Sequence, residues 1–234
     1  MAKGPAANDE EVPVVPIPKR VSAIVSDYHT LKHRLHNRTT FTATSSNDQT
    51  WTIKLNGMHN AITSQTTPNL HQPMGTQIAE TIYNYYRVIS CNVRFTFISE
   101  FDVDLMVGYE INDHTTTRIE GSTSRPRAFA ESKQTKSDIL PKIGATSPRV
   151  YNVTYHYNPS HFDHHITEQG TSERWTPKSE DPPIVRNIHF RALTADGTNL
   201  NWTTAYNALY TDVEYLVQWR EAATNIYSAV DTDQ

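Results

Sequence analysis

The sequence has little glycine and almost no cysteine. Its 234 residues include 8 glycines and a single cysteine, Cys91. One thiol excludes an internal disulfide framework and a cysteine-rich zinc site. The sequence also contains no G-x-G-x-x-G and no Walker-type loop, the glycine-rich motifs that cradle phosphates. With no nucleophile elbow and no H-E-x-x-H either, we expect neither an enzyme nor a cofactor.

Long apolar runs and a strong net charge are also absent. No apolar run approaches the ~20 residues of a membrane-spanning helix, so we expect no membrane insertion. The first residues lack the apolar core of a secretory signal peptide, and we expect none. The formal net charge is -4, which removes the global signature of a basic protein without excluding nucleic-acid binding.

Residues 1–20 differ in composition from the rest. They contain four prolines and an acidic trio at positions 9–11, and they have little apolar surface to bury. This predicts a flexible N-terminal arm. No second linker and no internal repeat divides the remainder, so residues 21–234 predict one domain.

What the chain has in abundance is alternation of apolar and polar residues. The clearest case is 89–97, where Ile89, Cys91, Val93 and the next two odd positions are apolar and the even positions are polar. A period of two predicts a strand with one face in the core, so Cys91 is expected to be a buried apolar residue. The full pattern predicts eight strands, two of them weaker (31–44 and 132–140): 31–44, 51–55, 89–97, 103–111, 132–140, 151–157, 184–192 and 213–219.

Eight such strands predict an all-β jelly-roll sandwich. If the strands are lettered B to I, the CD, EF and GH connections are long, and the other four are short. Alternate connections of a jelly roll lie at opposite ends, so we expect one narrow end, which suits packing around a fivefold axis, and one bulky end. Long loops in a compact domain usually have a function, here the covering of an outer surface and contact with neighbours. The long connections are 57–81, 112–131 and 158–183.

A more specific motif begins at Gln72. A Gln-Pro-x-Gly segment at 72–75 leads into Tyr-x-x-Tyr-Arg-Val at 83–88. Towards the C-terminus, a Pro-rich approach to a strand (181–192) and an Asp-Gly turn (196–197) precede a closing strand (211–220). In order and spacing, over most of residues 35–220, the sequence resembles the coat proteins of small circular Rep-encoding single-stranded DNA viruses, the circovirus-like group.

This resemblance implies a single jelly roll of the viral capsid type, a structural subunit that assembles with copies of itself. It implies a T=1 icosahedral shell of 60 subunits, a single-stranded DNA genome as cargo, and a virion location with assembly in the host nucleus. The Arg-rich N-terminal arm of that group, which binds genome and directs nuclear import, has no counterpart in residues 1–40. Either a longer arm has been lost from the mature chain, or packaging follows another route.

A basic stripe is the first candidate site. If the segment near residue 35 is extended, four side chains share one face: Lys32, Arg34, His36 and Arg38. Such a stripe would bind phosphates without sequence preference and in a salt-dependent way. We extend the hypothesis to Lys19 and Arg20; the alternative is a solvated strand face.

Two loop tryptophans and a histidine-rich loop complete the candidates. Trp175 and Trp202 fall in expected loops, and aromatic residues are enriched at subunit interfaces, so we expect one of them to be buried against a neighbour. The segment 161–165 holds three histidines and an aspartate, which are competent metal ligands. It lacks helical spacing and a partner cluster, so we expect a pH-sensitive surface loop and no metal site.

Three other interpretations stay open. A coat protein of a small RNA virus or satellite virus shares the fold and differs in its cargo. A carbohydrate-binding jelly-roll module would act as a monomer with aromatic side chains on a concave face. A jelly-roll metalloenzyme would need convergent histidines, and His156 and His189 are scattered along the sequence.

Overall fold

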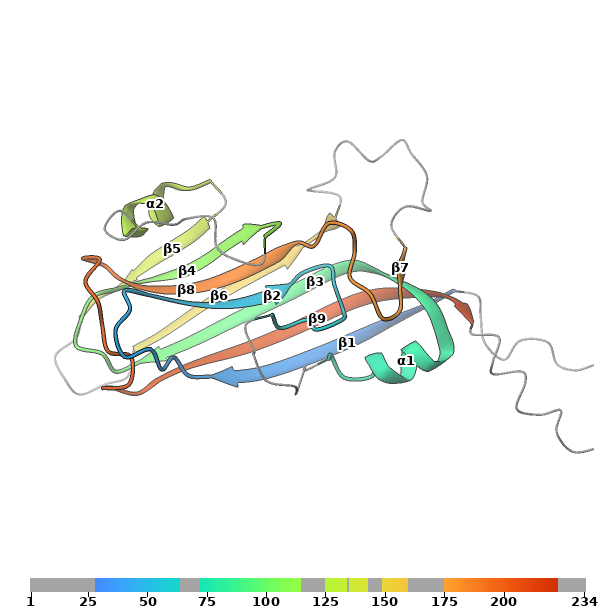
Figure 1. The fold of residues 1–234 in the computed structure, drawn as a ribbon, viewed down its shortest axis with the longest axis horizontal. Helices are drawn as coiled ribbons and strands as arrows, with labels where there is room; N and C mark the ends of the chain where they lie inside the picture. The colour runs from blue at the N-terminus through green and yellow to red at the C-terminus, as the bar shows by residue number, and fades with distance from the viewer. Residues whose placement is uncertain are drawn as a thin grey trace, which may run out of the picture.

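The computed structural model describes residues 28–63, 72–114, 125–133, 135–142, 149–159 and 175–222. These residues form two antiparallel sheets packed face to face, together with two short helices (Figure 1). The helices are α1 (Thr76–Ile82) and α2 (Arg125–Glu131). Neither combines the length and the apolar character needed to cross a membrane.

The first sheet has the strand order β1-β9-β3-β6. A short strand, β7, also pairs with β3. Strands distant in sequence are neighbours here, since β9 is hydrogen-bonded to both β1 and β3. The strands are β1 (Tyr28–Thr39), β3 (Tyr83–Ser99), β6 (Arg149–Tyr157), β7 (Thr176–Pro177) and β9 (Asn207–Ala222).

The second sheet has the order β2-β8-β4-β5. With β7 set aside, the eight long strands lettered B to I give the orders B-I-D-G and C-H-E-F. This is jelly-roll topology, and the predicted fold class is confirmed. The strands are β2 (Asp48–Lys54), β4 (Leu105–Asn112), β5 (Thr135–Leu140) and β8 (Asn187–Thr194).

Aromatic side chains join the two sheets across the core. Phe190 of β8 lies with its ring centroid 5.3 Å from that of Phe95 and 5.6 Å from that of Phe97, both on β3. All three are fully buried. Cys91 is buried on the same face of β3, as predicted, and burial raises the pKa of its thiol well above the usual value.

Two apolar side chains that were expected to face inward from a strand, Ile89 and Ile184, are exposed. β3 contains a bulge between Val88 and Ser90, where the pairing with β9 shifts by one residue. Ile89 is the extra residue, so it is 38% exposed while Val88 is buried. A bulge reverses the inward positions because the side-chain period is two. Ile184, expected to lie in a strand, precedes β8 and is exposed.

The short connections meet at one end of the sandwich. Backbone hydrogen bonds join Ser46 to Leu200 in both directions, at 3.1 and 3.0 Å. The guanidinium of Arg149 donates to the carbonyl oxygens of Val103, Leu140 and two further residues. The helix α1 and the strand β7 lie at the other end, and α2 lies beside β5 (Figure 1).

Candidate nucleic-acid interface

The predicted basic stripe is present on β1, at one edge of the first sheet. Lys32, Arg34, His36 and Arg38 are all exposed, and the odd positions between them are buried. The shared face is therefore confirmed; its binding of nucleic acid remains a prediction. Lys19 and Arg20 lie outside the described residues.

Carboxylates of β9 pair with this stripe. Glu214 accepts hydrogen bonds from Lys32 Nζ at 3.1 Å and from Arg34 Nε at 2.9 Å. These two bonds hold the pKa of the Glu214 carboxyl below its usual value. The pairing follows from register, because Arg34 lies directly opposite Glu214.

The next carboxylate along β9, Asp212, bridges two strands. It lies opposite His36, with 2.5 Å between its Oδ1 and His36 Nδ1, and it accepts from Arg94 of β3 at 2.6 Å. Partial burial alone would raise its pKa, but the hydrogen bonds from His36 and Arg94 outweigh burial, and the pKa is lowered.

Three arginines that the stripe hypothesis did not include extend the same surface. Arg87 and Arg94 lie on β3 and Arg220 on β9. Arg87 Nε donates to Gln218 of β9 at 2.9 Å, and Arg220 pairs with Glu221 at 3.0 Å. We define the basic face by six cations: Lys32, Arg34, Arg38, Arg87, Arg94 and Arg220. Against three carboxylates (Asp212, Glu214 and Glu221), they leave a surplus of three positive charges, although the whole chain carries -4.

Aromatic rings lie at both ends of the basic face. Trp175, next to β7, has its ring centroid 4.8 Å from the guanidinium carbons of both Arg87 and Arg220. Tyr28 lies beside it, with 6.1 Å between ring centroids. At the other end, the guanidinium of Arg38 lies 5.8 Å from the ring centroid of Tyr210. The expected interface role of Trp175 stays a prediction.

Trp202 has no exposed surface that a neighbouring subunit could contact. Its side chain is fully buried inside its own subunit, where its ring packs edge-on against Phe41 and Phe101. Its indole N–H donates to the carbonyl oxygen of Ser46 at 2.9 Å. The interface prediction for Trp202 is wrong, because a connection between strands here folds over the end of the core.

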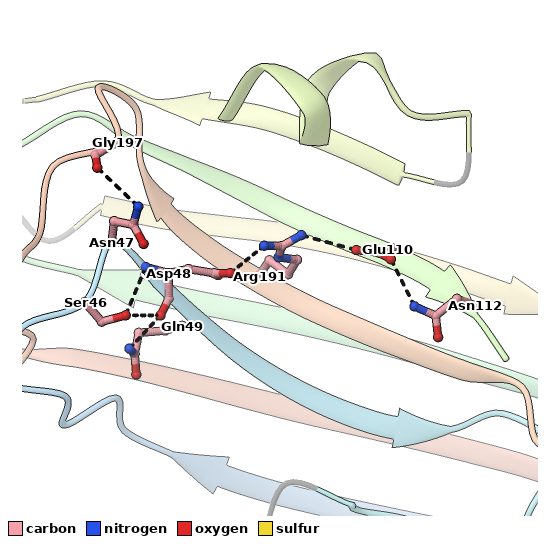
Figure 2. A network of polar contacts seen from close by, with 8 residues as sticks. All are labelled: Ser46, Asn47, Asp48, Gln49, Glu110, Asn112, Arg191 and Gly197. Carbon is pink, nitrogen blue, oxygen red and sulfur yellow. Dashed lines mark hydrogen bonds and ion pairs between the residues drawn. The ribbon is translucent and has the colours of Figure 1, made fainter. Parts of the chain in front are cut away.

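A second polar group of residues lies on the outward side of the second sheet, and the sequence did not reveal it. Figure 2 shows Arg191 of β8 reaching Asp48 of β2 in one direction and Glu110 of β4 in the other. Arg191 is fully buried, and its guanidinium carbon lies 5.2 Å from the ring centroid of Phe129 in α2. Asn112 donates to Glu110 at 2.9 Å.

His189 is buried in the same layer. Its Nδ1 lies 2.7 Å from the hydroxyl of Thr52, and its Nε2 lies 2.9 Å from Asn112 Oδ1. Burial lowers its pKa to about 4, so the ring is neutral at pH 7 and Nε2 donates. Alternation alone predicts only that these polar positions face away from the core, and it does not reveal that they are buried. The signal that could have revealed their burial is Phe129, an apolar side chain in a long connection that covers the sheet.

Within the described ranges, no three His, Cys, Asp or Glu side chains form a group able to hold a metal ion. The histidine-rich segment 161–165 falls outside those ranges. His156 and His189 belong to different sheets, and His156 Nδ1 lies 2.5 Å from Asn92 Oδ1.

Comparison with known proteins gives similarity in chain fold only. No protein-family model and no curated protein sequence matches the chain. Several solved viral capsid proteins are similar in structure. The BFDV capsid protein in its 60-mer form has a TM-score of 0.44 and 13% identity, covering 85% of this chain and 96% of that one. The virus-like particle of Macrobrachium rosenbergii nodavirus has a TM-score of 0.42 and 8% identity, covering 85% of this chain and 97% of that one. The structure of Mud crab tombus-like virus has a TM-score of 0.41 and 8% identity, covering 87% of this chain and 95% of that one.

Proposed function

We propose that this chain is the coat-protein subunit of an icosahedral virus, and that 60 copies form a T=1 shell around a single-stranded DNA genome. The observation that carries the proposal is the position in the jelly roll of the motif at residues 72–88. Met74 N donates to Arg34 O of edge strand β1 at 2.8 Å. Gly75 follows with a φ of +84° and is the N-cap of α1, which leads into β3. The motif therefore has a defined structural role, in which only glycine adopts the turn without strain.

The surface favours association with copies of the chain. Beside β1, Met74 and Ile78 are 83% and 68% exposed; at the opposite edges of the two sheets, Ile139 of β5 and Val150 of β6 are 56% and 51% exposed. Large apolar side chains on opposite edges suit a contact between two different surfaces of neighbouring copies, which closes into rings. Obligate interfaces of this kind commonly bury more than ~2,000 Å².

The basic face supports the cargo part of the proposal. Contacts to phosphates are blind to sequence and weaken with salt, so this face would suit DNA and RNA alike. Lys32, Arg34 and Arg38 are its described stripe residues, and Lys19 and Arg20 extend the same proposal to the preceding segment.

Assembly of the full-length recombinant chain tests the proposal. We expect size-exclusion chromatography with light scattering to show a large species, and negative-stain electron microscopy to show hollow particles. Folded protein that stays monomeric across pH and salt would exclude a shell subunit. DNase and RNase digestion of co-purified nucleic acid then identifies the cargo, and RNA in place of DNA would favour the RNA-virus alternative.

A matched pair of variants on α1 tests the edge contact. Ile78→Asp places a charge in the exposed apolar surface, and Gln77→Asp places the same charge one residue earlier on the same helix. We expect Ile78→Asp to reduce particle yield strongly, with little effect from Gln77→Asp and unchanged circular dichroism for both. Equal yields for the two variants would show that this edge is not a contact.

A further inference from the structure

We propose that the basic face binds single-stranded nucleic acid in preference to a duplex, and that Trp175 is a stacking platform for an unpaired base. This inference rests on the proposed function, since it assigns the cargo contact to particular residues and a particular strandedness. The observation behind it is the arrangement of the face: cations in the middle and an aromatic ring with arginine at each end.

The two aromatic ends are far enough apart to contact different nucleotides. In the β1–β9 register, Tyr28 lies opposite Arg220 and Arg38 lies opposite Tyr210. Positions 28 and 38 are ten residues apart on one strand, which corresponds to ~33 Å at about 3.3 Å per residue. Lys32, Arg34 and Arg94 lie between them. A single strand laid along this track would place phosphates on the cations and bases near both aromatic ends.

Trp175 differs from the other tryptophans in its exposure. Trp51, Trp202 and Trp219 are at most 5% exposed, whereas Trp175 is only partly buried and lies next to two guanidinium groups. Aromatic rings flanked by arginine bind single strands without sequence preference, because every base offers a π-face. Paired bases in a duplex are already stacked, so this contribution is available to single strands alone.

The position of Trp175 makes the binding directly measurable. With three of four tryptophans buried, quenching of intrinsic fluorescence by an added oligonucleotide reports mainly on Trp175. The full-length chain is first shown by light scattering to be unassembled. It is then titrated with oligothymidine of about 15 nucleotides and, separately, with a duplex that has the same number of phosphates. We expect saturable quenching and tighter binding for the single strand. No quenching, or tighter binding of the duplex, would overturn the inference.

Variants separate stacking from charge. With a fluorescently labelled oligonucleotide and anisotropy as the readout, Trp175→Leu should weaken single-strand binding about tenfold and duplex binding less than twofold. Trp175→Phe, which keeps an aromatic ring, should retain most of the affinity. Arg127→Gln removes an exposed cation from α2, away from the basic face. It should change neither the single-strand affinity nor the duplex affinity. Equal weakening of single-strand and duplex binding by Trp175→Leu would contradict a stacking role.

Particle assembly, measured on the same variants, separates this inference from the proposed function. If Trp175→Leu abolishes particles and leaves oligothymidine binding unchanged, Trp175 is a subunit contact and the inference is wrong. If the wild-type chain forms no particles but shows saturable, single-strand-selective quenching, the inference stands and the shell proposal fails.

Discussion

Glu214 limits how much positive charge the basic face presents. Its carboxylate accepts hydrogen bonds from both Lys32 and Arg34, so phosphates compete with it for two of the six cations. The carboxylate is thus placed to weaken and tune binding. A weaker contact is useful where a genome is to be held by many subunits at once, because many small contributions add up.

Glu214→Gln should therefore strengthen binding. The amide keeps the side-chain shape and removes the charge, so Lys32 and Arg34 become available to phosphates. We expect oligothymidine affinity to rise severalfold and its salt dependence to steepen, with little change in thermal unfolding. The control is Glu131→Gln, which frees Arg127 on α2 and should leave affinity unchanged. Identical affinities for Glu214→Gln and wild type would show that the face does not contact phosphates.

Arg191 is the residue on which the second polar group depends. It is fully buried between two carboxylates, of which Glu110 is also buried. Removing one partner of a buried ion pair leaves a charge without compensation, which typically costs about 3–5 kcal/mol.

We accordingly expect Arg191→Met to lower the free energy of unfolding by about that amount, measured by urea denaturation. Adding Glu110→Gln and Asp48→Asn to the same variant should restore part of the loss, because the remaining partners are then neutral. If the single variant were as stable as wild type, Arg191 would not be compensating these carboxylates.

At the level of strands, the edge strand β5 is held close to β4 at Gly108. A Cβ built on Gly108 would lie 1.9 Å from the carbonyl oxygen of Lys136 on β5. Real Cβ atoms do not approach backbone so closely, and neither strand can move without losing ladder hydrogen bonds. Glycine is needed here for close approach of two strands.

Gly108→Ala should consequently displace β5. We expect loss of hydrogen-exchange protection in the β5 amides, retained protection in β3 and β9, and destabilisation by more than about 2 kcal/mol. Ser137, which lies opposite Gly108, provides the control, since Ser137→Ala removes a hydroxyl without adding bulk. Normal protection of β5 in Gly108→Ala would mean that the two strands separate more easily than their spacing indicates.

Strand positions were predictable because alternation is local. Each long strand carries several alternating residues, and burial of one face against the other sheet maintains the pattern. The bulge at Ile89 was not predictable in this way. Val88 and Ile89 are both apolar, so either could face inward from sequence alone, and pairing with β9 selects Val88.

At the scale of the whole molecule, two buried histidines make stability dependent on pH. Burial lowers the pKa of His189 to about 4, and it also lowers the pKa of His33. His33 Nε2 accepts from the indole N–H of Trp219 at 3.0 Å, and its Nδ1 lies 3.2 Å from Met74 O. At pH 7 both rings are neutral in the folded chain, and protonation would remove an acceptor that each hydrogen-bond network uses.

The folded state should therefore lose stability in acid. Because an unfolded histidine titrates near 6.5, the unfolded chain takes up protons that the folded chain does not as the pH falls from 6.5 to about 4. The contribution of these histidines to stability is complete above about pH 6.5 and is lost across this window, by about 3 kcal/mol for His189. We expect His189→Gln to show a smaller difference in urea midpoint between pH 7 and pH 4.5 than wild type. Equal differences would assign the acid sensitivity to other groups.

The candidate site was predictable only in part. The β1 stripe was visible because its cations alternate along one strand. The carboxylates that pair with it, and Arg94 that joins it, come from strands far away in sequence. The burial of Trp202 was not predictable for the same reason, because it too depends on segments distant in sequence. A residue in a connection becomes part of the core when that connection folds over the end of the sandwich.

The sequence by itself determined the eight strands, the inward face of most of them, and the all-β sandwich that they form. Only the tertiary structure determined whether the outward face of each sheet is exposed or buried. The outward face of the first sheet keeps exposed cations, whereas the outward face of the second sheet is buried at β8 and at Glu110 of β4, with α2 over Arg191. The physical reason is that a period of two separates the two sides of a strand, while exposure of the polar side depends on segments that pack over it from elsewhere in the chain.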